Sequence, residues 1–277
     1  MIIVLAASAA ILCGVLYLWT KRTERHAHWM PPGERCDLSP LLAKTALTDA
    51  DYDLLLHETG LGRLGVDVLL STGKQDTILR MQEMLYAPIT YRCRRFSPIS
   101  WTERLTDTKG QVHAGLELVP LEDGDVLISA SSHTLGWCNG HAGIVVNAQK
   151  GETLESVVIG QKASVCSIEK WREYPTVLVL RLKGASGEER AAIAKDALRR
   201  LKGTPYRLAV GVFSRKHWGS RPPKGTQCAH LVWEAFRPFG YDLDSDGGRI
   251  VTPHDIAASP LLELVQVYGL DPDKLWR

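Results

Sequence analysis

The sequence predicts an α+β fold, in which strands follow one another along the chain and helices come before and after them. Three short apolar stretches, residues 124–128, 141–146 and 153–159, are predicted to be strands, separated by a polar loop and a glycine-containing turn. A fourth strand, continuously apolar, is expected at residues 176–182. Strands in series with helices grouped outside them are typical of an antiparallel sheet with packed helices rather than of alternating parallel units.

Composition is that of a globular protein with its own core. The chain has 277 residues, of which 45% are apolar and 23% are charged. The formal net charge is +2, and no basic stripe with interleaved aromatic residues is present, so nucleic-acid binding is not expected. The six cysteines are widely spaced and include no Cys-x-x-Cys pair, so no disulfide framework is expected.

The N-terminal segment, residues 2–19, carries no charge and is followed by Lys21, Arg22 and Arg25. At a rise of about 1.5 Å per residue, such a helix nearly spans the apolar core of a bilayer. A basic start and a small-residue cleavage site are both lacking, so residues 1–20 are expected to be an uncleaved single-pass membrane anchor. A cleaved export signal is the alternative. The positive charges after the segment favour a cytoplasmic location for the rest of the chain.

Three further regions follow the expected anchor. Residues 21–40 carry the run Pro31-Pro32-Gly33 and are interpreted as a linker. Residues 41–119 are interpreted as a helical extension, and residues 120–277 as the domain that carries the chemistry.

Helix signals lie in the first half of the extension. Thr48 and Asp51 have the spacing of a capping box before an apolar run. A second helix is expected over residues 74–85, and residues 91–120 are expected to be irregular. Because these helices show only packing signals, no function is assigned to them.

Two more helices are expected in the domain. Ser186 and Glu189 cap the first, which ends at Gly203. The second starts near Cys228 and ends at Gly240. Its apolar positions lie on one side and predict that it packs against a sheet.

Cys228 and His141 form the predicted nucleophile and base. Cys228 falls on the first turn of its helix, where the helix dipole and free backbone N–H groups favour a thiolate. His141 begins a strand and shares a sheet face with Gly143, which is expected to leave room for a cysteine arriving from a packed helix. His230 is the alternative base, but it lies only two positions from Cys228, and such positions do not face each other on a helix.

Glu155 is the candidate for the group that orients the base. With a five-residue loop at 148–152, Glu155 lies on the same sheet face as His141, whereas a loop longer or shorter by one residue would place it on the other face. A solvated strand glutamate is the alternative. For the oxyanion, the backbone N–H of Cys228 and the side chain of Gln227 are the candidates.

With these residues in place, the chain resembles the YiiX/YebB-like cysteine hydrolases, a circularly permuted branch of the NlpC-type papain-like superfamily. The resemblance covers roughly residues 120–270. It rests on the order and spacing of residues 124–128 (GDVLI), 140–145 (GHAGIV), 153–155 (TLE), 203–206 (GTPY), 226–233 (TQCAHLVW), 241–248 (YDLDSDGG) and 251–256 (VTPHDI).

The resemblance implies a permuted papain-like fold and hydrolysis of an amide or ester through a thioacyl intermediate. It implies Cys228 as nucleophile, His141 as base and Glu155 as the third polar residue, with no metal or organic cofactor. The family includes relatives of cell-wall peptidases and of lecithin retinol acyltransferase, so a cell-wall peptide, an N-acyl amide and a lipid ester remain open as substrates, and acyl transfer remains open as a reaction. The relation to envelope enzymes also leaves the side of the membrane open.

Aromatic residues near the motifs are candidates for substrate contact. Trp137 and Tyr206 are the main ones, with Trp218 and Trp233 as further members of a groove near the thiol. Packing in the core is the alternative for each of them.

Two other constellations compete with this interpretation. His133, Cys138 and His141 are zinc-ligand types in one segment, but their spacing fits no standard finger, and Cys138 is a second conceivable nucleophile. Residues 242–247 copy the first half of a calcium loop, but Pro253 stands where the glutamate is expected, which favours an aspartate-rich turn.

The expected function is therefore a membrane-anchored thiol hydrolase. The rival is a non-catalytic module of the same fold that holds a peptide or a lipid in the same cleft.

Overall fold

The computed structural model describes residues 11, 14–15, 18, 27–219 and 221–275. It has the predicted α+β class, with two antiparallel sheets and helices packed around them. The larger sheet has the strand order β10-β9-β3-β6-β7-β8. Its strands are β3 (Val126–Ser129), β6 (His141–Asn147), β7 (Glu152–Glu155), β8 (Ser164–Ser167), β9 (Val177–Leu182) and β10 (Leu262–Tyr268).

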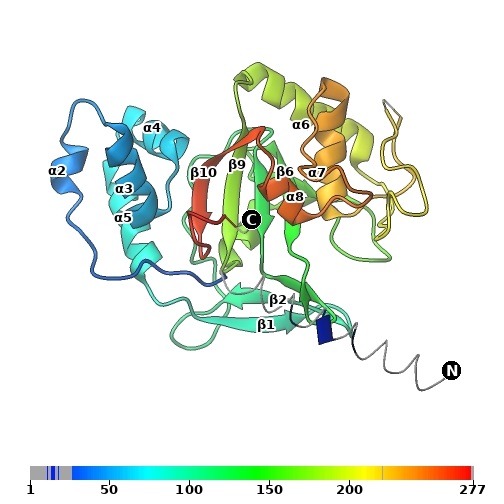
Figure 1. The fold of residues 1–277 in the computed structure, drawn as a ribbon, viewed down its shortest axis with the longest axis horizontal. Coiled ribbons are helices and arrows are strands. Elements are labelled where there is room, and N and C mark those ends of the chain that lie inside the picture. Colours follow the sequence, from blue (N-terminus) through cyan, green and yellow to red (C-terminus); the bar gives the residue numbers. More distant parts are fainter. Residues whose placement is uncertain (1–10, 12–13, 16–17, 19–26, 220, 276–277) are drawn as a thin grey trace.

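Helices of the C-terminal half pack on one face of this sheet, and the helices that precede it lie beside its β10 edge (Figure 1). One face packs on the helices of the C-terminal half, which are α6 (Gly187–Leu201), α7 (Cys228–Phe236) and α8 (Pro253–Ala257). The helices that precede the sheet, α3 (Asp49–Thr59), α4 (Arg63–Ser71) and α5 (Gln75–Tyr86), lie beside β10, where α4 contacts the strand. Three short elements complete the helices: α2 (Ser39–Leu42), η1 (Ile168–Glu173) and η2 (Arg237–Phe239).

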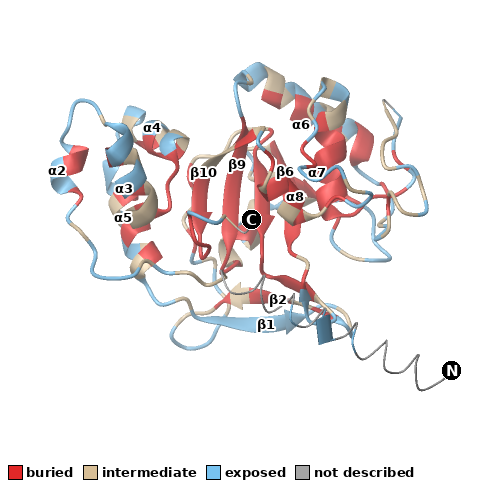
Figure 2. Ribbon diagram, in the orientation of Figure 1, coloured by how far each residue is buried: buried red, intermediate tan, exposed pale blue. Residues whose placement is uncertain are grey.

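The two cores follow from side-chain alternation along the strands. In β3, Val126 and Ile128 belong to the core that includes α6 and α7, while Leu127 between them belongs to a second core on the other face, which also includes buried residues of α3 to α5. The central strands are buried on both faces (Figure 2), which explains why they are almost continuously apolar. The helices at 49–86 therefore share a core with the sheet.

Local signals placed most helix boundaries correctly. Thr48 and Asp51 form the expected capping box at the start of α3. Ser186 accepts a hydrogen bond from the Glu189 N–H and starts α6. After α7, the short helix η2 carries the chain to Gly240, whose left-handed backbone (φ +90°) ends it.

The expectation that residues 91–120 are irregular is wrong for their first half. Strands β1 (Tyr91–Arg95) and β2 (Ser100–Leu105) form a hairpin there. It extends into a small sheet of order β1-β2-β4-β5, in which β4 (Ser132–Thr134) and β5 (Trp137–Cys138) come from the segment expected to be a loop. Apolar alternation cannot reveal β1, because all five of its residues are exposed (Figure 2).

The expected membrane anchor, residues 1–20, falls almost entirely outside the described residues. Across the part of the chain that the structure describes, no helix combines the length and the apolar character needed to cross a membrane.

Candidate active site

The thiol of Cys228 sits at the first position of α7, as predicted. Gln227 caps this helix, since its Oε1 accepts the Ala229 N–H at 2.8 Å. The Cys228 N–H has no acceptor within the helix, because the first turn of a helix leaves its donors free. Cys228 is only 8% exposed, yet it lines a cleft of about 810 Å³.

His141, the first residue of β6, lines the same cleft. Its imidazole lies near the thiol of Cys228, which helps to raise the pKa of His141. Its Nε2 lies 2.5 Å from Oε2 of Glu155. The structure therefore brings Cys228 and His141 to one cleft, with Glu155 in contact with His141.

Glu155 reaches His141 through the pairing of β6 with β7. Asn147 pairs with Glu152, so the connecting loop has four residues, 148 to 151, instead of the expected five. A bulge between Val145 and Asn147 supplies the missing residue and restores the face. Glu155 therefore lies on the face of the sheet that carries His141.

Both oxygens of the Glu155 carboxylate are fully used. Oε2 is 2.5 Å from His141 Nε2 and 2.5 Å from Lys170 Nζ. Oε1 accepts from Thr153 Oγ1 at 2.5 Å and from Trp171 Nε1 at 3.0 Å. The side chain is completely buried, and burial opposes its charge, but the neighbouring His141 and Lys170 outweigh burial and hold the pKa of Glu155 below its usual range.

The same contacts act on His141 in the opposite direction. Burial alone would lower the pKa of His141, but the nearby Cys228 thiol, the hydrogen bond to Glu155 and the charge of Glu155 raise that pKa to about 10. The imidazole is thus held as a cation beside the thiol at neutral pH. A cationic imidazole is the partner that stabilises a thiolate.

Gly143 has a role other than the one predicted. The space beside it does not receive the cysteine. A Cβ added at Gly143 would lie 3.0 Å from Glu155 Cγ and 3.0 Å from Trp171 Cζ2. Gly143 therefore makes room for the carboxylate and the indole that support His141.

Of the four aromatic residues predicted to contact the substrate, only Tyr206 lines the cleft. Tyr206 lines the cleft, and burial together with the nearby Cys228 raises the pKa of its phenol, which is therefore protonated at neutral pH. Trp137 lies in β5 and is exposed, but it is not among the residues that line the cleft. Trp218 and Trp233 do not line it either, and Trp233 Nε1 donates to Asp242 Oδ1 at 2.7 Å.

Gln227 does not have the geometry of the predicted oxyanion donor. Its Oε1 caps α7, and its Nε2 donates to the backbone oxygen of Val251. Both ends of the amide are thus used within the protein, and Gln227 does not line the cleft. An amide next to the nucleophile is better placed to cap the helix than to reach the substrate.

His230, the alternative base, is turned away from the thiol. Its Nε2 lies 2.6 Å from the Lys216 backbone oxygen, and its Nδ1 lies 2.9 Å from Thr226 Oγ1. Burial lowers the pKa of His230 to about 4, so it is neutral and held by two structural hydrogen bonds.

The zinc and second-nucleophile alternatives also find no support in the geometry. Among the described residues, His133, Cys138 and His141 do not bring their ligand atoms together. Cys138 is buried, and its thiol donates to the Ala130 backbone oxygen at 2.9 Å. It is absent from the lining of the cleft.

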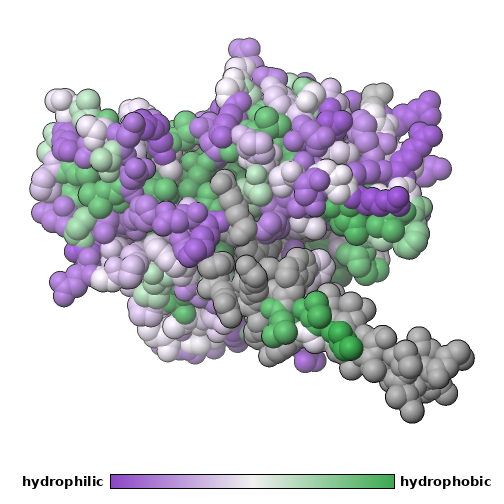
Figure 3. Space-filling model, viewed as in Figure 1, coloured by the Kyte–Doolittle hydropathy of each residue, from purple (hydrophilic) through white to green (hydrophobic). Residues whose placement is uncertain are grey.

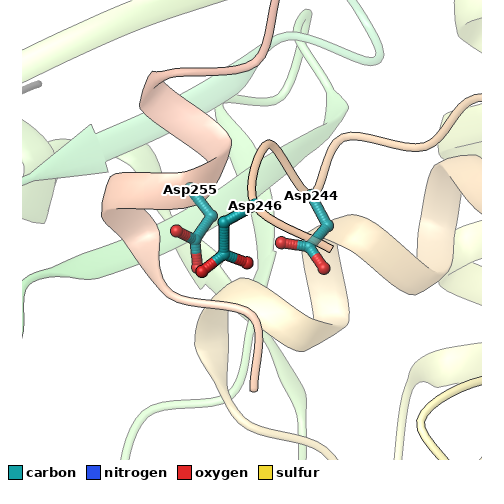
Figure 4. Close-up of side chains that lie close together, drawn as sticks. All are labelled: Asp244, Asp246 and Asp255. Carbon is teal, nitrogen blue, oxygen red and sulfur yellow. The ribbon is translucent and has the colours of Figure 1, made fainter. Parts of the chain in front are cut away.

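The aspartate-rich segment forms a cluster away from the cleft. Asp244, Asp246 and Asp255 point toward one another (Figure 4), with one oxygen of each within 4.8 Å of the others. The ammonium of Lys216 donates to Asp244 and to the Gly248 backbone oxygen, and Asp255 is engaged in capping α8. The cluster thus already contains a cation from the protein itself.

Sequence reasoning missed Lys170, which touches the carboxylate of the site. It lies in η1, a short helix with no catalytic pattern around it, and only the pairing of β7 with β8 brings it to Glu155. The residues of the β1–β2 hairpin that line the cleft were missed as well, because their strands were not predicted.

Comparisons with known proteins found limited similarity. No family profile and no curated protein matches the chain. Among solved structures, it is similar to YiiX of Escherichia coli O157:H7, described as a metalloprotein, at 16% sequence identity and a TM-score of 0.41. The similarity covers 53% of this chain and 97% of YiiX.

Proposed function

We propose that this protein is a thiol hydrolase that cleaves an amide or an ester through an acyl-enzyme on Cys228. The observation that carries the proposal is that Cys228 and His141 line one cleft, where the imidazole is held by Glu155 at 2.5 Å. A nucleophile, a base in contact with it, and a third group that fixes the base are what covalent catalysis requires.

The residues assign the proton transfers. Glu155 holds one ring nitrogen of His141, which leaves the other for Cys228. The thiolate attacks the carbonyl carbon, and the S–C bond forms. His141 gives its proton to the departing nitrogen or oxygen as the scissile bond breaks. Water then attacks the thioester and returns a proton to His141 while the S–C bond breaks. The cycle consumes one water and releases a carboxylic acid.

The negative charge that develops on the carbonyl oxygen has two candidate donors. One is the backbone N–H of Cys228, at the start of α7. The other is the protonated phenol of Tyr206, which lies close enough to Cys228 for its pKa to respond to the thiolate.

The order of elements supports assignment to the permuted papain-like class. The base lies on a strand, β6, and the nucleophile lies on a later helix, α7, which packs against that strand. We extend the proposal to the membrane anchor expected over residues 2–19, which would hold the enzyme at a bilayer.

Alkylation of Cys228 tests the proposal. In the full-length protein, labelling by iodoacetamide is followed by mass spectrometry across pH in wild type and in His141→Ala. We expect Cys228 to label well below pH 8 and faster than the other cysteines, and the advantage to be lost in the variant. Labelling at the rate of the exposed Cys93, unaffected by His141→Ala, would overturn the proposal and favour the binding-module rival.

A further inference from the structure

The cleft around Cys228 gathers exposed apolar side chains. Within residues 27–275, twelve large apolar side chains are exposed, and six of them line this one cleft. Single exposed apolar residues are common on protein surfaces, but a contiguous group is typical of a binding site. The six are Phe96, Ile99, Leu135, Val157, Ile159 and Leu208.

Two hairpin turns build one wall. Phe96 and Ile99 lie in the turn between β1 and β2, and Leu135 lies in the turn between β4 and β5. The Leu135 N–H donates to the Ile99 backbone oxygen at 2.8 Å, which joins the two turns.

The second wall comes from the other side of the site. Val157 and Ile159 follow β7, and Leu208 precedes α7. These segments are also joined, because the Tyr206 N–H donates to the Gln161 backbone oxygen at 2.9 Å. Figure 3 shows an apolar area on the right of the molecule, where Figure 1 places the segment that precedes α7.

A leucine at position 135 is energetically unfavourable for two reasons. Its backbone is left-handed, with φ +52°, and its side chain is 76% exposed. Asn or Gly normally occupies such a position in a two-residue hairpin turn. A leucine that is both strained and exposed, at the rim of a cleft that holds the nucleophile, is better explained by a ligand than by folding.

Cationic side chains stand beside the apolar wall. Arg94 and Arg95, at the exposed end of β1, also line the cleft. A guanidinium group at that place favours a phosphate or a carboxylate on the ligand.

From this arrangement, and resting on the proposed function, we infer that the cleft takes a long-chain acyl ester or amide with an anionic head group. The acyl chain lies between the two apolar walls, its carbonyl carbon lies at Cys228, and the head group lies toward Arg94 and Arg95. A cell-wall peptide, rich in polar groups, would leave these walls without a partner.

Chain length tests the apolar walls. The probes are p-nitrophenyl acetate and p-nitrophenyl decanoate, with p-nitrophenolate release as the readout. We expect kcat/KM to favour the decanoate by about 100-fold in wild type, since each methylene removed from water strengthens binding. A ratio near one would overturn the inference. If wild type turns over both esters with a ratio near one and Cys228→Ala turns over neither, the inference fails while the proposed function stands. If wild type and Cys228→Ala turn over the esters equally, the proposed function itself fails.

The variant Leu135→Asn removes the apolar side chain at the rim of the cleft and keeps a residue that suits the turn. Asparagine suits a left-handed turn, so thermal stability is expected to be unchanged or raised. The ratio of decanoate to acetate is expected to fall about tenfold. Leu54→Asn, at an exposed position on α3 outside the cleft, is the control and should keep the wild-type ratio. An unchanged ratio in Leu135→Asn would contradict the assignment of this wall.

The head group is tested with decanoyl glycerol 3-phosphate against decanoyl glycerol. We expect a preference for the phosphate that disappears in the double variant Arg94→Gln and Arg95→Gln. Arg92→Gln removes a positive charge from the same strand outside the cleft lining and is the control for each of the single variants Arg94→Gln and Arg95→Gln. A preference that survives the double variant would remove the head-group assignment.

Discussion

Gly143 lies directly beneath the carboxylate of Glu155, so that a methyl group on Gly143 would stand 3.0 Å from Glu155 Cγ. It would also stand 3.0 Å from Trp171 Cζ2, and both neighbours are completely buried. The glycine thus sets the depth at which the carboxylate that contacts His141 can sit.

Gly143→Ala is expected to reduce both stability and activity. The buried neighbours cannot retreat freely, so overpacking should cost about 1–3 kcal/mol in the free energy of unfolding. Displacement of Glu155 should lower kcat more than it raises KM. Chemical denaturation and ester turnover measure the two effects. Gly160→Ala is the control, because a methyl group added there meets nothing within 4 Å. Since the backbone of Gly160 is left-handed, we expect a small loss of stability in this variant but no loss of activity. Full activity in Gly143→Ala would show that the support of His141 tolerates movement.

Glu155→Gln is expected to lower the pKa of His141. The carboxylate helps to raise that pKa to about 10, and a neutral amide removes its charge. In wild type the ring should therefore stay protonated through neutral pH and lose its proton only as the pH approaches 10. In the variant it should lose the proton at a lower pH.

The ring ¹⁵N shifts of His141, followed by NMR from acid to alkaline pH, measure this change. Glu152→Gln, at the start of the same strand, is the matched control and should leave the titration where it is. An identical titration in wild type and Glu155→Gln would refute the coupling.

Tyr206→Phe is expected to reduce kcat by about 100-fold if the phenol donates to the developing oxyanion. KM should change little, because that contact strengthens only as charge builds on the carbonyl oxygen. Tyr241→Phe removes a hydroxyl whose partner is Glu189, away from the cleft, and should keep wild-type turnover. A rise in KM with unchanged kcat would instead make Tyr206 a residue that only binds the substrate.

How far the site could be predicted depended on whether each residue belongs to a local pattern. Cys228 begins an amphipathic helix, and His141 begins an apolar strand, so both could be placed from neighbouring residues. Glu155 followed from alternation, although the loop is one residue shorter than expected and a bulge corrects the register. Gln227 was misassigned because a capping amide and an oxyanion donor look the same in sequence.

The remaining parts depend on contacts between distant segments. The strand β1 is exposed and basic, so no apolar period marks it, and it joins the small sheet through β2, whose partner β4 lies far along the chain. Lys170 meets Glu155 only because β7 and β8 pair. Tertiary pairing of this kind is not encoded in the residues next to either partner.

Lys216→Met is expected to destabilise the protein without changing the active site. The ammonium of Lys216 neutralises Asp244, whose side chain is almost completely buried beside Asp246. Removing it leaves a buried carboxylate without a counter-charge, which should cost about 3 kcal/mol in the free energy of unfolding. Burial raises the pKa of Asp244, so acidification neutralises that group early, and the cost should shrink as the pH falls.

Urea denaturation at neutral and acid pH measures both effects. Lys224→Met, at an exposed position, is the control, and Asp244→Asn added to Lys216→Met should restore part of the loss. Equal losses in Lys216→Met and Lys224→Met would mean that the cluster does not depend on the lysine for its charge balance.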